Sequence, residues 1–228
     1  MDDKVFDEAT ANSWIEAIEK PGLTKRDKDI YPRLNKWLEI YGAENILDHG
    51  CGQGLCSQKV RGYKAYTGVE ASPFMVARAK QNYVADNITF TEGNAYSLPF
   101  KDGSFDGAFS VLVFHLLEDL ETATAELARV LTKGGSFCIM TANPDAIAAW
   151  SKMYTNCEIT NHSTGKRLHG VMNLDGNPSE DTLYFHTLNA IDAAFRGQGL
   201  HLHGVETFRP ASEEDRTDML LMFAGVKL

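Results

Sequence analysis

A short apolar strand that runs into three alternating glycines constrains this chain of 228 residues more than any other feature. The run Ile46–Gly54 reads Ile-Leu-Asp-His-Gly-Cys-Gly-Gln-Gly, and a helical pattern follows it. Glycine lacks a Cβ, so the backbone can turn sharply and approach a ligand closely, and N–H groups at the start of the next helix point toward that ligand. Glu70 ends the next strand pattern, 20 residues after Gly50. At that spacing a carboxylate accepts hydrogen bonds from a ribose, so the sequence predicts a pocket for a nucleoside-containing cofactor.

Strand and helix patterns alternate from about Asn45 to Met140, which is typical of a parallel sheet with helices on both faces. Ser72-Pro73 has the chemistry of a helix start, and Gly134-Gly135 has that of a helix end. The predicted strands are 45–49, 65–70, 88–92, 105–113 and 135–141, and the predicted helices are about 55–62, 72–84 and 119–131.

The chain after this core is harder to interpret. We expect a helix near 145–154, followed by a polar segment to His186 that is rich in turn-forming residues. It is long for a plain connection, so it either shapes a substrate pocket or, in its middle part 174–181, forms a disordered surface loop. A helix over 187–197 and strands over 200–208 and 218–226 follow, and two such strands can pair antiparallel.

Residues 1–43 contain two helical patterns separated by Pro21-Gly22. One carries Phe6 and Trp14, and the other spans Ile30 to Tyr41. We expect most of this region to pack against the sheet. Some residues near 5–32 would form a lid over the cofactor, and in that interpretation Tyr31 and Arg33 lie near the ligand.

Composition limits the partners and the compartment. The net charge of −9 argues against a nucleic-acid partner. No apolar run approaches the roughly 20 residues needed to cross a bilayer, and no signal peptide is visible. The four cysteines show no metal-binding spacing and fit reduced thiols in a cytoplasm. We therefore expect a cytoplasmic protein with no metal and no membrane partner.

The order of these motifs resembles the class I S-adenosylmethionine (SAM)-dependent methyltransferases, in particular the small-molecule branch that includes the ubiquinone-biosynthesis type. The resemblance is strong from Ile46 to Met140 and weak elsewhere. It implies a single α/β domain, with a doubly wound, mostly parallel, Rossmann-like seven-stranded sheet and its last strand inserted antiparallel. The implied parts are a helical lid region over 1–43, a SAM-binding core over 44–141, a substrate-pocket insertion over 142–186, and a helix with an antiparallel strand pair over 187–228.

The resemblance also implies roles for particular residues. Glu70 would accept both ribose hydroxyls, Asn94 and Ala95 would bind the adenine edge, and a carbonyl near Ser110 would accept from the ammonium group. Asn94 stands where aspartate is usual, and His49 stands where an aliphatic residue is usual; we expect His49 to be structural. The implied cofactor-binding residues are Asp48, Gly50, Cys51, Gly52, Gly54, Glu70, Ala71, Met75, Asn94, Ala95 and Ser110.

The implied reaction is in-line methyl transfer to oxygen, nitrogen or carbon of a small molecule. His115 is the first candidate for a general base, and His186 is the next; the other histidines are interpreted as loop or structural residues. Three alternatives stay open: a non-catalytic SAM-binding regulator, a nicotinamide-dependent oxidoreductase whose glycine fingerprint this chain does not match, and an RNA or protein methyltransferase. The acceptor, the methylated atom and the choice between monomer and homodimer are not determined by the sequence.

Overall fold

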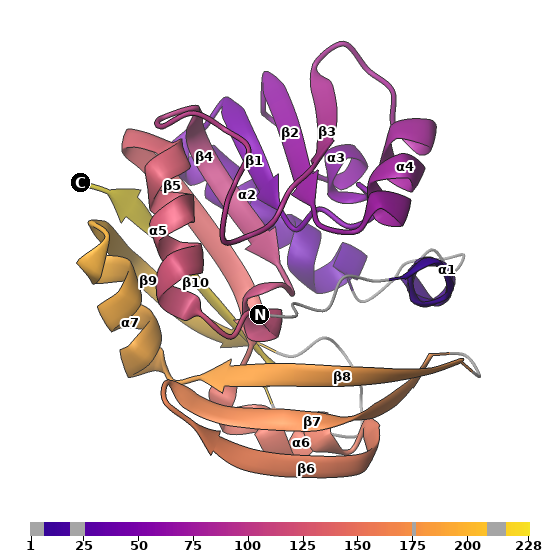
Figure 1. Cartoon of the computed structure of the whole chain (residues 1–228). Coiled ribbons are helices and arrows are strands. Elements are labelled where there is room, and N and C mark those ends of the chain that lie inside the picture. Colours follow the sequence, from indigo (N-terminus) through magenta and orange to yellow (C-terminus); the bar gives the residue numbers. More distant parts are fainter. Residues whose placement is uncertain (1–6, 19–25, 175–176, 209–217) are drawn as a thin grey trace.

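The computed structural model describes residues 7–18, 26–174, 177–208 and 218–228 (Figure 1). Among these residues, seven strands form the main sheet in the order β3-β2-β1-β4-β5-β10-β9. Its strands are β1 (Asn45–His49), β2 (Ala65–Glu70), β3 (Ile88–Glu92), β4 (Phe105–Val111), β5 (Leu131–Ala142), β9 (Leu200–Phe208) and β10 (Leu220–Lys227). The first five run parallel, whereas β10 lies antiparallel between β5 and β9. The predicted doubly wound sheet is confirmed.

Helices cover both faces of this sheet, as Figure 1 shows. One apolar cluster joins α2 (Tyr31–Tyr41), α3 (Cys56–Lys59) and α4 (Pro73–Asn82) to one face, and a second joins α5 (Leu120–Val130) and α7 (Leu188–Gly197) to the other. Because β1 has helices on both sides, Ile46 and Leu47 are both fully buried. The topology thus holds the glycine run at the carboxyl end of a central strand.

The predicted glycine cap of one helix was wrong, and so was the predicted length of another. The helix predicted over 119–131 ends at Val130, and Leu131 is already extended. Leu131 pairs with Phe105 of β4, so the backbone has joined the sheet before it reaches Gly134 and Gly135, which lie within β5. The glycine pair therefore does not cap the helix. The helix predicted over 55–62 is the short α3, which ends at Lys59.

A second, three-stranded antiparallel sheet follows the main sheet's fifth strand, where we expected weak structure. A short turn η3 (Pro144–Ala146) and helix α6 (Ile147–Ser151) lead into β6 (Tyr154–His162), β7 (Gly165–Leu174) and β8 (Asn177–His186). The possibility of a disordered loop was wrong for 177–181, which belong to β8; residues 175 and 176 lie outside the described part. We call β6–β8 the acceptor sheet. Figure 1 shows it below the main sheet.

The N-terminal part supplies α1 (Glu8–Ile18), a π-helical turn η1 (Arg26–Ile30) and α2. Helix α1 contacts α4 of the main domain and also β7 and β8, so it bridges the two sheets. Tyr31 is buried in the main apolar cluster and Arg33 binds Glu206. Phe6 and the Pro21-Gly22 break lie outside the described residues. Over the part of the chain that the structure describes, no helix is both long enough and apolar enough to span a membrane.

Candidate active site

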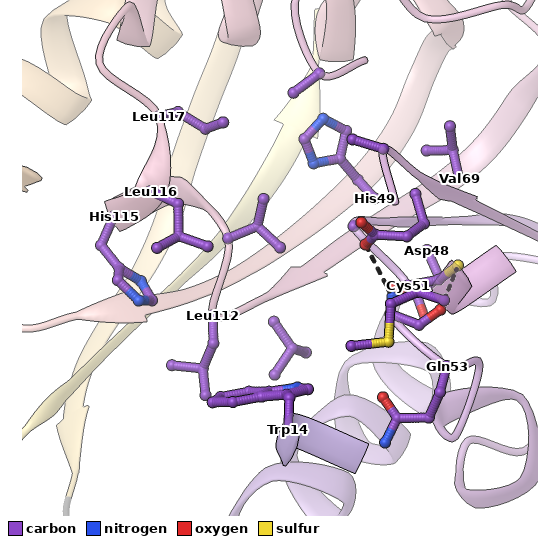
Figure 2. A pocket seen from close by; sticks show the side chains of 18 of the residues that line it. Trp14, Asp48, His49, Cys51, Gln53, Val69, Leu112, His115, Leu116 and Leu117 are labelled. Carbon is purple, nitrogen blue, oxygen red and sulfur yellow. Dashed lines mark hydrogen bonds between the residues drawn. The ribbon is translucent and has the colours of Figure 1, made fainter. Parts of the chain in front are cut away.

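A cavity of about 200 Å³ opens where β1 and β4 end, between the two sheets. From β1, the chain extends the sheet to one side through β2 and β3, and then to the other side through β4 and β5. At such a switch point the connections diverge and leave a crevice in which ligands bind. Figure 2 shows Asp48, Cys51 and Gln53 on one side of this cavity and His115, Leu116 and Leu117 on the other. We call these the glycine-loop half and the acceptor half.

The glycines of the loop differ in what they do. Gly50 and Gly52 have φ of 77° and 53°, in the left-handed region that favours glycine. A Cβ on Gly50 would lie 2.3 Å from Val113 Cγ2, whereas a Cβ on Gly52 would meet no atom within 4 Å among the described residues. Gly50 is therefore required by packing, and Gly52 faces open space that a ligand can fill.

Glu70 holds this loop from the end of β2. Its Oε2 accepts a hydrogen bond from Gly52 N at 3.1 Å, and its Oε1 accepts one from Ser72 N at 3.0 Å. Burial raises the pKa of the Glu70 carboxyl above its ordinary value, although these N–H groups oppose that shift. Each oxygen retains a lone pair for a ligand hydroxyl.

Asp48 lies at the base of the glycine-loop half. Its carboxylate accepts a hydrogen bond from the Tyr66 hydroxyl. Burial raises the pKa of Asp48 to about 7, against the opposing effect of that hydrogen bond. The cavity's cation is Arg26 of η1, whose guanidinium lies 5.9 Å from the centroid of the Trp14 ring. The Nε2 of Gln53, another lining residue, is buried without a hydrogen-bond partner among the described residues.

The remaining predicted cofactor residues border the same half. Ala71, Met75, Asn94, Ala95 and Cys51 all line the cavity. The side-chain oxygen of Asn94 accepts a hydrogen bond from Tyr96 N at 2.7 Å, which fixes the orientation of the amide. Met75 packs against Ala11 and Ile15 of α1, so that helix covers this part of the site.

The acceptor half is mostly apolar. Leu112, Leu116, Trp150, Met172 and Leu183 line it, together with the Tyr154–Asp181 pair. Leu112 has a φ of 62°, which is unusual for a residue with a Cβ, and such strained backbone concentrates at functional sites.

His115 is the imidazole that reaches this half. Its Nδ1 lies 3.3 Å from Thr141 Oγ1, and its ring centroid lies 5.4 Å from that of Trp150. Burial lowers the pKa of His115 to about 3, and neighbouring His186 acts in the same direction. The imidazole is therefore neutral near pH 7.

Three predicted site residues lie outside the cavity lining. Gly54 packs against the ring of Phe90, where a Cβ would come within 2.7 Å. The Ser110 hydroxyl is buried in β4 and donates to the His49 carbonyl at 2.8 Å. His186 is buried behind the cavity, where its Nε2 contacts the Leu117 carbonyl.

Several lining residues were missed by sequence reasoning. Arg26, Leu112, Met172, Asp181 and Leu183 were not identified individually, and they come from four segments: η1, the end of the predicted strand 105–113, β7 and β8. Gln53 stands between two motif glycines, and that position was its only signal. Trp14 was named only within a helical pattern, although it lies in the range near 5–32 where some residues were expected to form a lid.

Comparisons with known proteins show which proteins this chain is similar to. Residues 47–139 match the family model described as "Methyltransferase domain". O-methyltransferase resE of Aspergillus sclerotiorum is 28% identical over 152 residues, which is 61% of this chain and 56% of the relative. A malonyl-acyl-carrier protein O-methyltransferase of Erwinia billingiae is 34% identical over 115 residues, covering 48% of this chain and 45% of the relative. The chain therefore spans about half the length of these curated relatives.

Solved structures extend the likeness to most of the chain. An S-adenosylmethionine-dependent methyltransferase from Mesorhizobium loti superposes with a TM-score of 0.64 at 22% identity, over 88% of this chain and 99% of the other. One from Clostridium acetobutylicum gives a TM-score of 0.68 at 10% identity, over 94% and 96%. At these identities the likeness is one of fold. Residues 47–139 thus match a methyltransferase domain, and the chain as a whole has a fold like that of the SAM-dependent methyltransferases described above.

Proposed function

We propose that this chain is an enzyme that transfers a methyl group from SAM to an oxygen atom of a small molecule. One observation carries the proposal: a single cavity joins the glycine-loop half to an apolar half that holds a neutral imidazole. A cofactor and an acceptor can therefore meet in one space, with little water between them.

The residues of the glycine-loop half fit SAM. Gly52 leaves room for the methionine part against the backbone, and Glu70 offers lone pairs to the ribose. Asn94 and Ala95 would bind the adenine edge. Arg26 and the Gln53 Nε2, which has no partner among the described residues, would bind the carboxylate of the amino acid, because both donate hydrogen bonds and line the cavity.

SAM, when bound, supplies an electrophilic methyl group on a sulfonium for direct displacement. The chain's task is then to align the acceptor and to exclude water. Leu116, Trp150 and Leu183 do this by surrounding the acceptor with apolar surface. His115 is neutral at pH 7, so a ring nitrogen can accept a hydrogen bond from an acceptor hydroxyl.

Oxygen is the proposed acceptor atom because the relatives described above are named O-methyltransferases. These names do not point to the ubiquinone-biosynthesis branch, so membership of that branch stays a prediction from the sequence motifs. A small molecule is proposed rather than a nucleic acid because the net charge is −9. Within the predicted lid near 5–32, the described parts that carry Trp14 and Arg26 are proposed to cover the bound cofactor, since both residues line the cavity, whereas residues 5–6 and 19–25 lie outside the described residues.

Calorimetric titration with SAM, S-adenosylhomocysteine and NAD tests the cofactor. We expect saturable binding of the first two and none of NAD; saturable NAD binding without a response to SAM contradicts the proposal. Transfer is then tested with methyl-labelled SAM and a panel of phenols and carboxylic acids. Label recovered only on amines would contradict the oxygen assignment and leave the cofactor assignment intact.

A further inference from the structure

A chain of hydrogen bonds runs behind the cavity, through residues that do not line it. His186 ends β8, and its Nε2 lies 2.8 Å from the Leu117 carbonyl oxygen. Its Nδ1 lies 2.6 Å from Thr164 Oγ1, in the turn between β6 and β7. The same hydroxyl lies 2.9 Å from Nδ1 of His162, the last residue of β6. The acceptor sheet thus meets the main domain through a continuous polar contact.

The direction of the first two bonds follows from the carbonyl, which can only accept. His186 Nε2–H must therefore donate to Leu117, and because burial lowers the pKa of His186, its Nδ1 carries a lone pair near pH 7. The Thr164 hydroxyl must then donate to that nitrogen. His162 Nδ1 lies 2.9 Å from the Thr164 hydroxyl oxygen and also accepts a hydrogen bond from Thr164 N at 3.4 Å, so the direction of its contact with the hydroxyl depends on the His162 tautomer. The Thr164 hydroxyl hydrogen and the His186 Nε2–H thus both point toward Leu117.

Leu117 is where this chain meets the site. It directly follows η2 (Phe114–Leu116), the short turn that carries His115, and His115, Leu116 and Leu117 all line the cavity. Figure 2 shows the three on one connected segment at the edge of the cavity. That segment is held within itself by Leu116 N donating to Val113 O at 2.7 Å, and by Leu117 N donating to Phe114 O at a longer 3.3 Å.

We propose that His186 is a positioning residue which, with Thr164 and His162, fixes the His115–Leu117 segment against the acceptor sheet. The need for this positioning rests on the proposed function. The acceptor is held partly by β6–β8 and partly by η2, so these two parts of the cavity wall must keep one relative position. His186 reaches the reaction only through Leu117. We therefore assign His186 this positioning role in place of the role of general base that the sequence suggested for it.

Hydrogen–deuterium exchange of the peptide covering residues 112–119 tests the proposal, with His186→Leu and His186→Gln compared to the parent. Leucine leaves the Leu117 carbonyl without its donor, and we expect exchange to be about tenfold faster, the scale of one lost hydrogen bond. Glutamine places an amide N–H near the position of Nε2 but is not a base, so we expect it to restore most of the protection. Thr164→Val, which removes the middle link and leaves His186 in place, is the second variant should His186→Leu fail to fold.

His169 provides a matched control in the same sheet. Its Nδ1 lies 3.0 Å from Thr182 Oγ1 and its Nε2 lies 3.0 Å from Glu180 Oε1, but both partners belong to β8 rather than to η2. We expect His169→Leu to leave exchange over 112–119 unchanged. Nitrogen-15 shifts of the His186 ring provide a signature of the bonding itself, with a protonated Nε2 and a bare Nδ1.

Parent-like exchange in both His186→Leu and Thr164→Val would overturn the proposal, and so would a protonated Nδ1 on neutral His186. Equal loss of protection in His186→Leu and His186→Gln would also contradict it. Titration with S-adenosylhomocysteine is run on each variant, where we expect parent affinity. A parent protein that fails to bind this ligand would contradict the proposed function, while the exchange result would still decide the hydrogen-bond chain.

Discussion

The two halves of the cavity are built in opposite ways. The glycine-loop half is made mainly from one stretch of chain, in which Asp48 to Gln53 and Glu70 to Met75 follow adjacent parallel strands. The acceptor half takes its walls from η2, α6 and all three strands of the acceptor sheet. The first half is therefore set by local backbone geometry, and the second by packing between distant segments.

This difference implies a division of labour that can be measured. Changes in the glycine-loop half should affect cofactor affinity directly, because backbone and carboxylate groups there face the ligand. Changes in the acceptor half should leave cofactor affinity nearly untouched. Substitutions of the same residue type in the two halves provide the sharpest comparison.

Gly52→Arg should have the largest effect. The new side chain would occupy the open space beside the loop, so we expect no measurable SAM binding by calorimetry, with a retained circular dichroism spectrum. Gly134→Arg is the control, because Gly134 also has a positive φ, of 81°, and open space around it, but it lies in β5 away from the cavity. If the Gly52 variant binds SAM, or if both variants lose SAM binding, the open space at Gly52 is not specifically required for the cofactor.

Glu70→Ala should weaken SAM binding by about 1.5–3 kcal/mol, the scale of hydrogen bonds to a charged group. Glu92 ends the neighbouring strand β3 in register with Glu70, yet it is exposed and outside the cavity. Glu92→Ala should therefore bind SAM like the parent in the same titration. Equal affinities for all three proteins would mean that Glu70 is not the ribose residue.

Asp48 should make SAM affinity depend on pH. Its pKa is raised to about 7, so near pH 6 the carboxyl is mostly protonated and a cationic ligand must displace that proton. Affinity should fall as the pH falls, by about tenfold from pH 8 to pH 6. Titrations of Asp48→Asn across the same range provide the reference, and a parent with the same pH profile as that variant would exclude Asp48 as the coupled group.

The smallest effect is expected from Met172→Ala in β7. Both Met172 and Met75 line the cavity, but Met172 lies in the acceptor half and Met75 beside the predicted adenine site. Met75→Ala should weaken SAM binding by about 1–2 kcal/mol through lost apolar contact, whereas Met172→Ala should change it less than twofold. A larger loss of SAM affinity in Met172→Ala than in Met75→Ala would contradict the assignment of cofactor binding to the glycine-loop half.

The same contrast explains what the sequence could predict. The glycine run, Glu70 and the alternating strands follow from short-range rules, because φ > 0 and two-sided burial restrict which residues can stand there. The strand over 218–226 was predicted from its pattern, but its antiparallel insertion into the main sheet, as β10, was implied only by the family resemblance. The roles of Arg26 and Leu112 arise from their place in the fold, and nothing in their local sequence marks them.

The acceptor sheet was missed for a physical reason. Most of β6 is exposed, so it lacks the alternation of apolar and polar residues that marks a half-buried strand. It pairs with β7 across the short turn that contains Thr164, where His162 faces Gly165. His186 was identified as a candidate base from its segment alone, because only the fold shows that its ring faces the Leu117 carbonyl.

The position of β10 between β5 and β9 has a consequence for the order of folding. Residues 143–219 are synthesised after β5 and before the strand that pairs with it, so β5 leaves the ribosome with one open edge. The buried Phe223 must still enter the core beside Phe195. Pairing across such a separation is slow compared with local contacts. The nascent chain therefore carries an unpaired apolar edge until β10 has been made, and an open strand edge of this kind favours aggregation.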